Sequence, residues 1–249
     1  MASASAGALA LEGDVGAVEA LLAEQGDGLV NVADEDGRTM LHWAASGGHP
    51  ALVACLLQHG ALPNALDELG WTSLHIAVSG GHTEITDALL TAGGDPFAIN
   101  SSGQLALHYA SSRNRLDCAR LLLDAAQAAE RAAAMASFPD RGDNTPLHRA
   151  AAQGLGEMVS LLLSAGAISA AVDKEGCTAL HLATVEQQLD VVKLLAEAGG
   201  EELLCIQNQE EQTAGEIAAA KAKALYGMGE ARDIAVELAA VLGSEAPLV

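Results

Sequence analysis

Five histidines recur along the chain, and by residue type they could bind a metal or act as general bases. Their successive spacings are 33, 33, 40 and 33 residues, and each stands in the same short phrase, of which WTSLHIA is one copy. A metal site needs several ligands within about 2 Å of one ion, and histidines a whole repeat apart do not converge. We therefore expect each histidine to brace its own turn by hydrogen bonds. The five are His42, His75, His108, His148 and His181.

Cys55 and His59 form a second candidate pair, because their i, i+4 spacing places both side chains on one face of a helix. Two ligands are too few for a zinc site. Cys55 also stands in an apolar line before Leu56 and Leu57, so we interpret it as a buried small hydrophobe. The sequence contains neither a GxSxG nucleophile turn nor a GxxxxGK[ST] phosphate-binding loop. The chain is therefore predicted to be no enzyme and to need no cofactor.

The elements that must position the histidines repeat with the same period. In four of the five phrases a glycine, such as Gly37 or Gly70, lies five residues before the histidine. A small or polar loop follows the phrase, and an apolar stretch then ends in a leucine pair such as Leu56-Leu57. Such a unit predicts a β-turn finger, a short helix, a tight turn and a longer helix. The predicted fold class is an all-α solenoid in which each unit buries its apolar face against its neighbours.

The period and the T-x-L-H-x-A phrase are typical of the ankyrin repeat, and the chain is identified as a member of that family. We predict a single domain, residues 1–249, with seven helix–turn–helix repeats and β-turn fingers. The first and last repeats, near 4–33 and 208–242, lack the phrase and are interpreted as caps. A last helix around 229–242 is expected to close the stack. The five repeats between the caps are 34–66, 67–99, 100–139, 140–172 and 173–207.

The repeat 100–139 carries seven extra residues within the Ala-rich segment 125–139. Alanine has the highest intrinsic helix propensity, and proline stops a helix. The insertion therefore predicts a longer second helix that ends before Pro139 and leaves the register of the later repeats unchanged.

The composition excludes several classes of protein. Hydrophobic residues make up 50% of the chain, too many for a disordered acidic protein. Only 12 lysines and arginines stand against 33 acidic residues, which argues against a protein that binds duplex nucleic acid. No run of 18 apolar residues and no basic leader occur, so we expect no membrane span and a soluble protein of the cytoplasm and nucleus with reduced cysteines.

Positions that the repeat leaves variable carry both tryptophans of the chain and one of its two tyrosines. The positions directly after a finger glycine and directly after a phrase histidine form two columns on the face formed by the fingers and first helices. Either these side chains anchor a partner protein, or they pack on neighbouring fingers. The candidate partner-binding residues in the columns are Arg38, Trp43, Trp71, Ile76, Tyr109 and Arg149.

More specific motifs extend over residues 34–198. The segments DEDGRTMLHWAASGGH, GWTSLHIAVSGGHTEI and LHYASSRNR resemble the gankyrin family, the ankyrin-repeat non-ATPase subunits of the proteasome regulatory particle. The resemblance implies a non-catalytic assembly chaperone, monomeric when free, whose concave face binds the C-terminal domain of a proteasomal AAA-ATPase subunit, the third of the base. By matched motif the implied partner-binding residues are Asp36, Arg38, Glu68 and Arg113.

Two further readings stay open. The chain could be an ankyrin scaffold that regulates a cyclin-dependent kinase or another signalling partner. The stretch from Leu182 to Glu186 matches the family's LxCxE sequence with Thr184 in place of cysteine, which puts retinoblastoma-type binding in doubt. We keep Glu186 as a candidate partner-binding residue.

Overall fold

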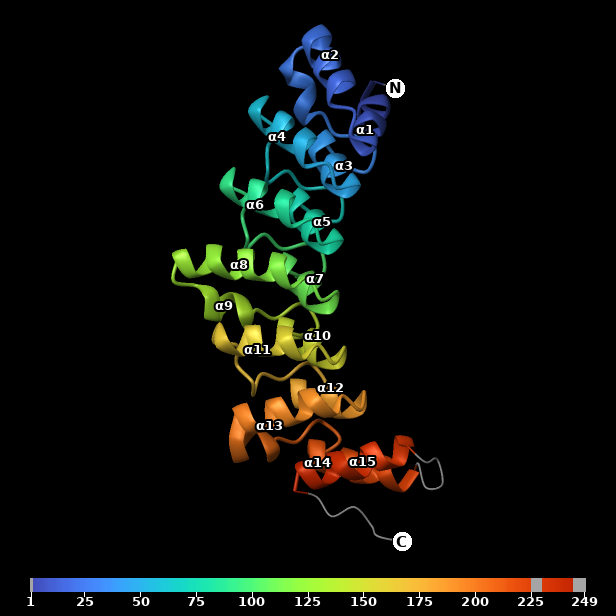
Figure 1. The fold of residues 1–249 in the computed structure, drawn as a ribbon, viewed down its shortest axis with the longest axis vertical. Coiled ribbons are helices and arrows are strands. Elements are labelled where there is room, and N and C mark those ends of the chain that lie inside the picture. The colour runs from blue at the N-terminus through green and yellow to red at the C-terminus, as the bar shows by residue number, and fades with distance from the viewer. Residues whose placement is uncertain (1, 225–229, 244–249) are drawn as a thin grey trace. The chain divides into compact units, whose positions relative to one another are not determined.

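The computed structural model describes residues 2–224 and 230–243, which form helices, turns and one isolated antiparallel bridge between Gln207 and Thr213. The chain divides into two compact units, Met1–Glu130 and Arg131–Val249 (Figure 1). We describe each unit by itself, and the single domain and its repeat boundaries stay predictions. Within the described ranges no helix has the length and apolar character needed to cross a bilayer.

Unit 1 consists of two layers of short helices. The inner helices contact one another in the order α1, α3, α5, α7, and the outer helices follow in the order α2, α4, α6, α8. Each inner helix also packs against the outer helix that follows it in the chain. The helices are α1 Ala2–Glu12, α2 Val15–Gln25, a 3-10 turn η1 Asp27–Asn31, α3 Met40–Gly47, α4 Pro50–Gln58, α5 Ser73–Gly80, α6 Thr83–Thr91, α7 Ala106–Ser112 and α8 Leu116–Ala128.

Unit 2 repeats the arrangement. Helices α10, α12 and α14 contact in sequence, as do α11, α13 and α15. The last helix, predicted around 229–242, is confirmed as α15. The helices are α9 Ala132–Ala136, α10 Pro146–Ala152, α11 Gly156–Ser164, α12 Ala179–Val185, α13 Leu189–Leu204, α14 Ala214–Ala224 and α15 Glu230–Val241.

The phrase histidines brace the start of the inner helices, as predicted. In α5 the backbone N–H of Thr72 donates to His75 Nδ1 at 3.2 Å, and His75 Nε2 lies 3.1 Å from the Gln104 carbonyl of the next finger. Because Nδ1 accepts, the imidazole is neutral, and Nε2 carries the proton and donates a hydrogen bond to the carbonyl. Each such histidine therefore ties one repeat to the next. The same link joins His42 to Trp71, His148 to Cys177 and His181 to Gln212.

The start of α14 is capped without a histidine. The Thr213 N–H donates to Glu216 Oε2 at 2.8 Å, and the Glu216 N–H donates to Thr213 Oγ1 at 3.2 Å. This is a reciprocal capping box built with glutamate. It stands where the other repeats have Thr and His, so the cap keeps the helix start and loses the link to a further finger.

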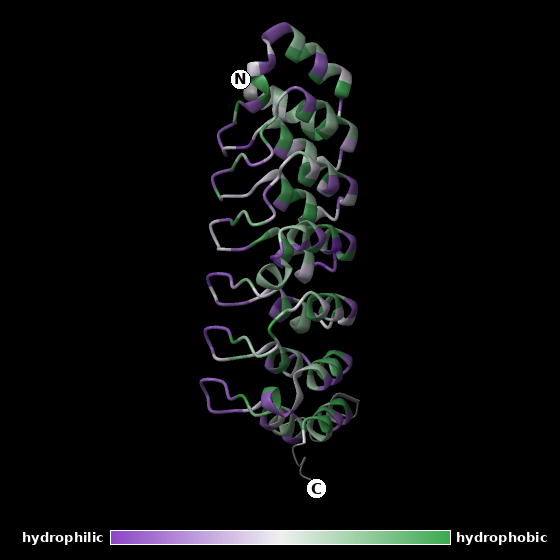
Figure 2. Ribbon diagram, turned by 90° about the vertical axis from the view of Figure 1, so that its left-hand side faces the viewer, coloured by the Kyte–Doolittle hydropathy of each residue, from purple (hydrophilic) through white to green (hydrophobic). Residues whose placement is uncertain are grey.

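The fingers lie on one side of the helices in each unit and carry hydrophilic residues (Figure 2). The Asp67 carboxylate folds its own finger by accepting from the Leu69 and Trp71 N–H groups at 2.9 and 2.8 Å. Successive fingers are joined by backbone hydrogen bonds, such as Ser101 N to Leu69 O at 2.9 Å. Gly37 shows why this stacking needs glycine, since its φ is +76° and a Cβ there would lie 2.9 Å from Glu68 N.

Small residues let the inner helices approach closely. Ala44, Ala77 and Ala110 occupy the same position of α3, α5 and α7, and each is fully buried. Leucines such as Leu56 and Leu89 fill the layer between inner and outer helices. The high alanine content and the scarcity of aromatic residues follow from this packing.

The prediction of a longer second helix is confirmed, but its extension through the insertion toward Pro139 is wrong. Helix α8 runs for 13 residues, against nine in α4 and α6, and ends at Ala128. The chain then turns at Glu130, whose φ is +57°, and forms the separate five-residue helix α9. The turn buries Met135 and Ala136 completely. A helix that continued straight would carry these apolar side chains into water, so burial overrides the helix propensity of the alanine run.

Candidate functional site

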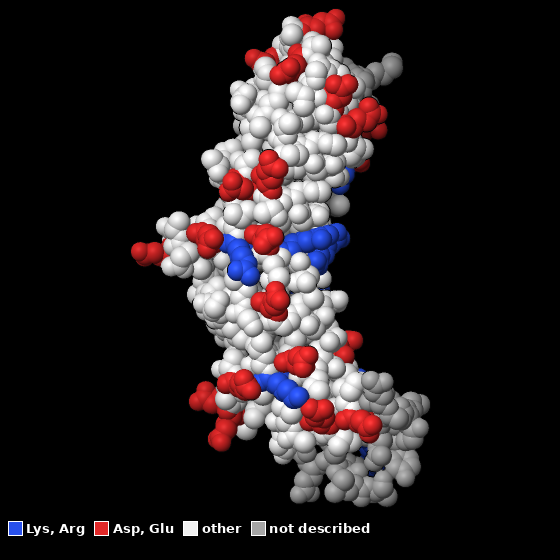
Figure 3. All heavy atoms as spheres, viewed as in Figure 1, with Lys and Arg blue, Asp and Glu red and all other residues white. Residues whose placement is uncertain are grey.

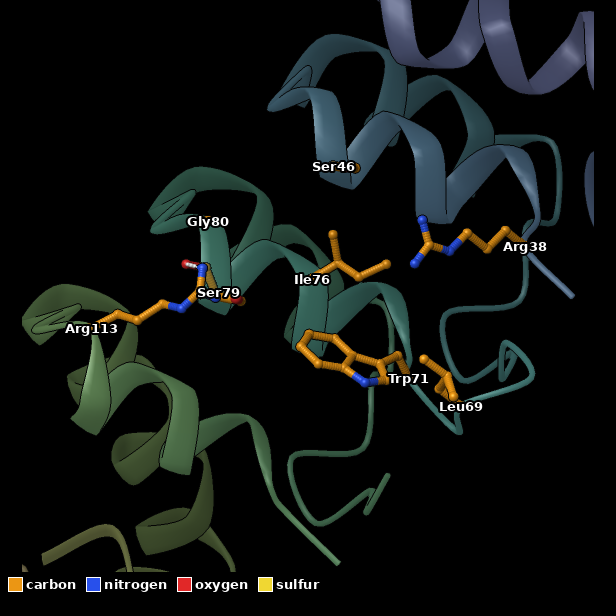
Figure 4. Close-up of a pocket in the computed structure, with 8 residues that line it drawn as sticks. All are labelled: Arg38, Ser46, Leu69, Trp71, Ile76, Ser79, Gly80 and Arg113. Atoms are coloured by element: carbon orange, nitrogen blue, oxygen red, sulfur yellow. Dashed lines mark hydrogen bonds between the residues drawn. The ribbon is translucent and has the colours of Figure 1, made fainter. Parts of the chain in front are cut away.

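Unit 1 contains a groove of about 340 Å³ on the face formed by its fingers and inner helices. We call it the unit-1 groove (Figure 4). Three lining residues come from the fingers, four belong to α3 and α5, and one directly follows the end of α7. The lining residues are Arg38, Ser46, Leu69, Trp71, Ile76, Ser79, Gly80 and Arg113.

An aromatic pair supports the wall of the groove. The Trp71 and Tyr109 rings lie 4.5 Å apart between centroids with a tilt of 46°. The Tyr109 hydroxyl donates to Gln104 Oε1 at 2.6 Å and accepts from Asn100 Nδ2 at 2.8 Å. These bonds fix Tyr109 on its own finger, and Tyr109 in turn holds the Trp71 ring in place beside the groove.

Arg38 is held by its neighbours. Its Nε lies 3.4 Å from Asp67 Oδ2, and its guanidinium carbon lies 5.0 Å from the centroid of the Trp43 ring. The Trp43 indole donates to Asp34 Oδ2 at 2.8 Å, and the same ring packs against Gly7 of α1. Arg38 and Trp43 therefore support each other and the first finger, besides any contact with a partner.

The carboxyl group of Asp34 is electrostatically stabilised in its charged form. Burial alone would raise the pKa of Asp34, but hydrogen bonds from the Arg38 backbone, the Trp43 indole and the Asp36 backbone, together with the positive charge of Arg38, lower the pKa below its ordinary value. A charged Asp34 keeps the first finger folded at neutral pH.

The charge of Arg113, unlike that of Arg38, is not paired with a carboxylate of the described residues. The residue is exposed at the end of α7, and its Nη1 donates to the Ser79 carbonyl at 3.4 Å. Within the described part of the chain no carboxylate lies within the 4.0 Å salt-bridge distance of its guanidinium. On the face shown in Figure 3 acidic side chains are scattered widely, and basic side chains gather beside α7. Arg113 is therefore a cation that a partner's carboxylate can reach.

Asp36 and Glu68 lie on the two fingers next to the groove, and both are exposed. The Glu68 N–H donates to the Asp36 carbonyl at 3.0 Å, so backbone bonds fix the fingers and leave both carboxylates in water. The groove thus combines an apolar wall with cations inside and anions at its edge. This mixture of charge favours one orientation of a bound protein.

The structure brings Arg38, Trp71, Ile76 and Arg113 together in the groove, whereas two candidates lie in unit 2. Arg149 forms a 2.6 Å ion pair with Asp140 of its own finger. Glu186 is exposed directly after α12. The LxCxE-like stretch before it is helical, with Thr184 fully buried and bonded to the Leu180 carbonyl. Partner binding by these residues stays a prediction.

Sequence reasoning did not find Leu69, Ser46 and Ser79. Leu69 had a signal in the sequence, since the matching fingertip residues Asp36 and Glu175 are acidic and a leucine stands out among them. The two serines had no such signal in the sequence, because their place in the groove depends on how α3 and α5 are rotated about their axes.

Cys55 and His59, the candidate pair, contact different residues and form no joint site. Cys55 is buried, as predicted, and its Sγ lies 3.8 Å from Glu19 Oε1. Burial, and then the Glu19 charge, raise the pKa of the Cys55 thiol, so it is no activated nucleophile. His59 Nδ1 instead lies 2.8 Å from Asp27 Oδ1. Throughout the described ranges no group of three or more His, Cys, Asp and Glu side chains is arranged to hold a metal ion.

Comparison with curated proteins finds partial relatives. A segment of 109 residues, 44% of this chain, is 37% identical to human ankyrin repeat and SOCS box protein 16 and covers 22% of that protein. A segment of 30 residues, 12% of this chain, is 63% identical to human acyl-CoA-binding domain-containing protein 6 and covers 11% of it. The matches therefore span less than a quarter of the length of either relative.

Solved structures match over most of the chain. The ankyrin repeat domain of Bcl-3, described as a unique member of the IkappaB protein family, is 29% identical with a TM-score of 0.72, covering 85% of this chain and 92% of that one. The human ASB11 ankyrin repeat domain shares the fold with a TM-score of 0.75 at 24% identity, covering 98% of this chain and 99% of that one. The model for ankyrin repeats in three copies matches residues 6–99, 63–132 and 128–208. Because these matches cover most of its length, the chain belongs to the ankyrin-repeat family.

Proposed function

We propose that this chain is a non-catalytic scaffold that binds a partner protein through the unit-1 groove. Ankyrin stacks offer extended binding surfaces built from repeats, which suits protein–protein interaction. The observation that carries the proposal is Arg113, an exposed cation beside the apolar Trp71 and Ile76 with no carboxylate of the described residues in reach. Aromatic and arginine side chains together are typical of the residues that dominate binding energy at interfaces.

For the partner we propose the C-terminal domain of a proteasomal AAA-ATPase subunit, the third of the base, so that the chain acts as an assembly chaperone of the proteasome regulatory particle. The support is the sequence resemblance at Asp36, Arg38, Glu68 and Arg113. All four lie in or next to the unit-1 groove, as one binding surface requires. The matched relatives support the ankyrin scaffold and do not bear on this partner. The corresponding cellular location is the cytoplasm and nucleus, and the chain is proposed to be monomeric when free.

Calorimetric titration of the purified chain tests the partner. We expect the ATPase C-terminal domain to bind at a ratio of one to one. Affinity should fall as salt rises, because exposed charges are screened over about 8–10 Å near physiological ionic strength. A cyclin-dependent kinase titrated in parallel should give no heat. Binding of the kinase without the ATPase domain would replace the proposed partner with the signalling alternative.

A further inference from the structure

Leu69 is an apolar side chain at a position where the other phrase-bearing repeats have a polar residue or glycine. It is 58% exposed at the tip of its finger, where the corresponding fingertip residues are Asp36, Ser102, Gly142 and Glu175. The finger uses only the backbone of Leu69, whose N–H donates to Asp67 Oδ1 and whose carbonyl accepts from Ser101. The finger therefore folds without the leucine side chain, which meets water at a cost in free energy.

Leu69 does not stand alone. It lines the unit-1 groove together with Trp71 and Ile76, and Figure 4 shows the three side chains on the same stretch of wall. Arg38 and Arg113 lie on either side of them in this view. The three apolar residues thus form a seat, here called the Leu69 seat, with a guanidinium near each end.

The two guanidinium groups differ in what they can still bind. Arg38 faces Asp67, whose carboxylate is 2% exposed and already folds the finger. Arg113 has one 3.4 Å bond to a backbone carbonyl. A partner carboxylate therefore finds its strongest new contact at Arg113, and a cationic group placed there would be repelled.

We propose that the Leu69 seat binds a bulky aliphatic side chain of a partner segment that also carries a carboxylate for Arg113. The occupant is a protein segment in which leucine, isoleucine or methionine stands close to aspartate or glutamate. This inference rests on the proposed function and adds an apolar anchor to its charged contacts. The aliphatic side chain supplies affinity by leaving water, and the carboxylate fixes the register of the segment.

The experiment selects binders from a display library of random 16-residue peptides on the full chain. Each selected peptide is then synthesised, labelled and titrated by fluorescence anisotropy against the native chain and two variants, Leu69→Asn and Leu66→Asn. Leu66 is the matched control, because it is 57% exposed on the same finger and does not line the groove. Asparagine replaces the apolar side chain by a polar one of similar size without adding charge, and urea unfolding checks that both variants fold.

We expect selected sequences that pair an aliphatic residue with an acidic one. Leu69→Asn should weaken their binding about tenfold or more, whereas Leu66→Asn should change it by less than about twofold. Equal binding to the two variants, enrichment of lysine and arginine in the selected peptides, or a library without binders would each overturn the proposal.

The seat and the proteasomal partner fail separately. If Leu69→Asn leaves the selected peptides bound while the ATPase domain still binds the native chain, the seat is refuted and the proposed function stands. If the ATPase domain does not bind while the selected peptides depend on Leu69, the partner is refuted and the seat stands.

Discussion

Acidification below pH 6.5 should destabilise this protein through four of its phrase histidines. Burial is the largest influence on His42, His75, His148 and His181, and it lowers the pKa of each below the ordinary value of 6.5, while hydrogen bonds to the next finger's carbonyl act in the opposite direction. In each of them Nδ1 accepts a hydrogen bond from the backbone N–H of a threonine. Protonation of Nδ1 would replace that hydrogen bond by two N–H groups that face each other. The folded chain therefore keeps these imidazoles neutral.

The sign and size of the effect follow from proton linkage. Below pH 6.5 the unfolded chain takes up protons that the folded chain refuses, so the free energy of unfolding falls as pH falls. Each histidine contributes about 1.4 kcal/mol per pH unit between its unfolded and folded pKa values. Four together contribute at most about 5–6 kcal/mol per pH unit, and even part of that is large beside the stability of an ordinary domain. This stability is fully present above pH 6.5.

Urea unfolding followed by circular dichroism at pH 7.5, 6.5, 6.0 and 5.5 measures the effect. A matched variant is His75→Gln. Glutamine can still cap the helix start with Thr72, in the way that Glu216 caps α14 with Thr213, and glutamine does not titrate. The variant should lose part of the stability at pH 7.5 and show a slope smaller by up to about 1.4 kcal/mol per pH unit. A midpoint that stays constant or rises between pH 7.5 and 5.5 would refute this account of the histidines.

Three substitutions test the packing. Gly37→Ala combines a φ of +76° with a Cβ position 2.9 Å from Glu68 N, so it should lower the free energy of unfolding by more than about 1 kcal/mol. The control is Gly60→Ala, where φ is +82° and no atom lies within 4 Å of the added Cβ. It should lower the free energy of unfolding by less in the same urea titration. Met135→Ala removes a fully buried side chain of α9 and should lower the free energy of unfolding by about 2–5 kcal/mol. An unchanged midpoint would show that α9 does not stabilise the fold.

The fold could be predicted from sequence because the repeat is written in local signals. Thr and His three residues apart specify a helix start, and the glycine before them marks a finger that needs positive φ. The end of the longer second helix was mispredicted because the turn at Glu130 is decided by the burial of Met135, which no local propensity records.

The site was less predictable, because its side chains interact between repeats. The Arg38 and Asp67 contact joins residues 29 positions apart, and the Trp71 and Tyr109 pair joins neighbouring repeats. Their column positions identified Arg38, Trp71 and Tyr109 as candidates, but did not show that these side chains also stabilise the fingers. Arg149 is the clearest case, since its ion pair with Asp140 depends on how the finger folds over α10.

The central claim is that the unit-1 groove is the partner-binding surface, and charge reversal tests it most directly. Arg113→Glu is the clean change, because Arg38→Glu would place a carboxylate against the buried Asp67. Arg120→Glu is the matched control, an exposed arginine of α8 that does not line the groove. With the ATPase C-terminal domain as partner, surface plasmon resonance should show at least about tenfold weaker binding for Arg113→Glu and a change below about twofold for Arg120→Glu. Equal affinities for the two variants would contradict the account.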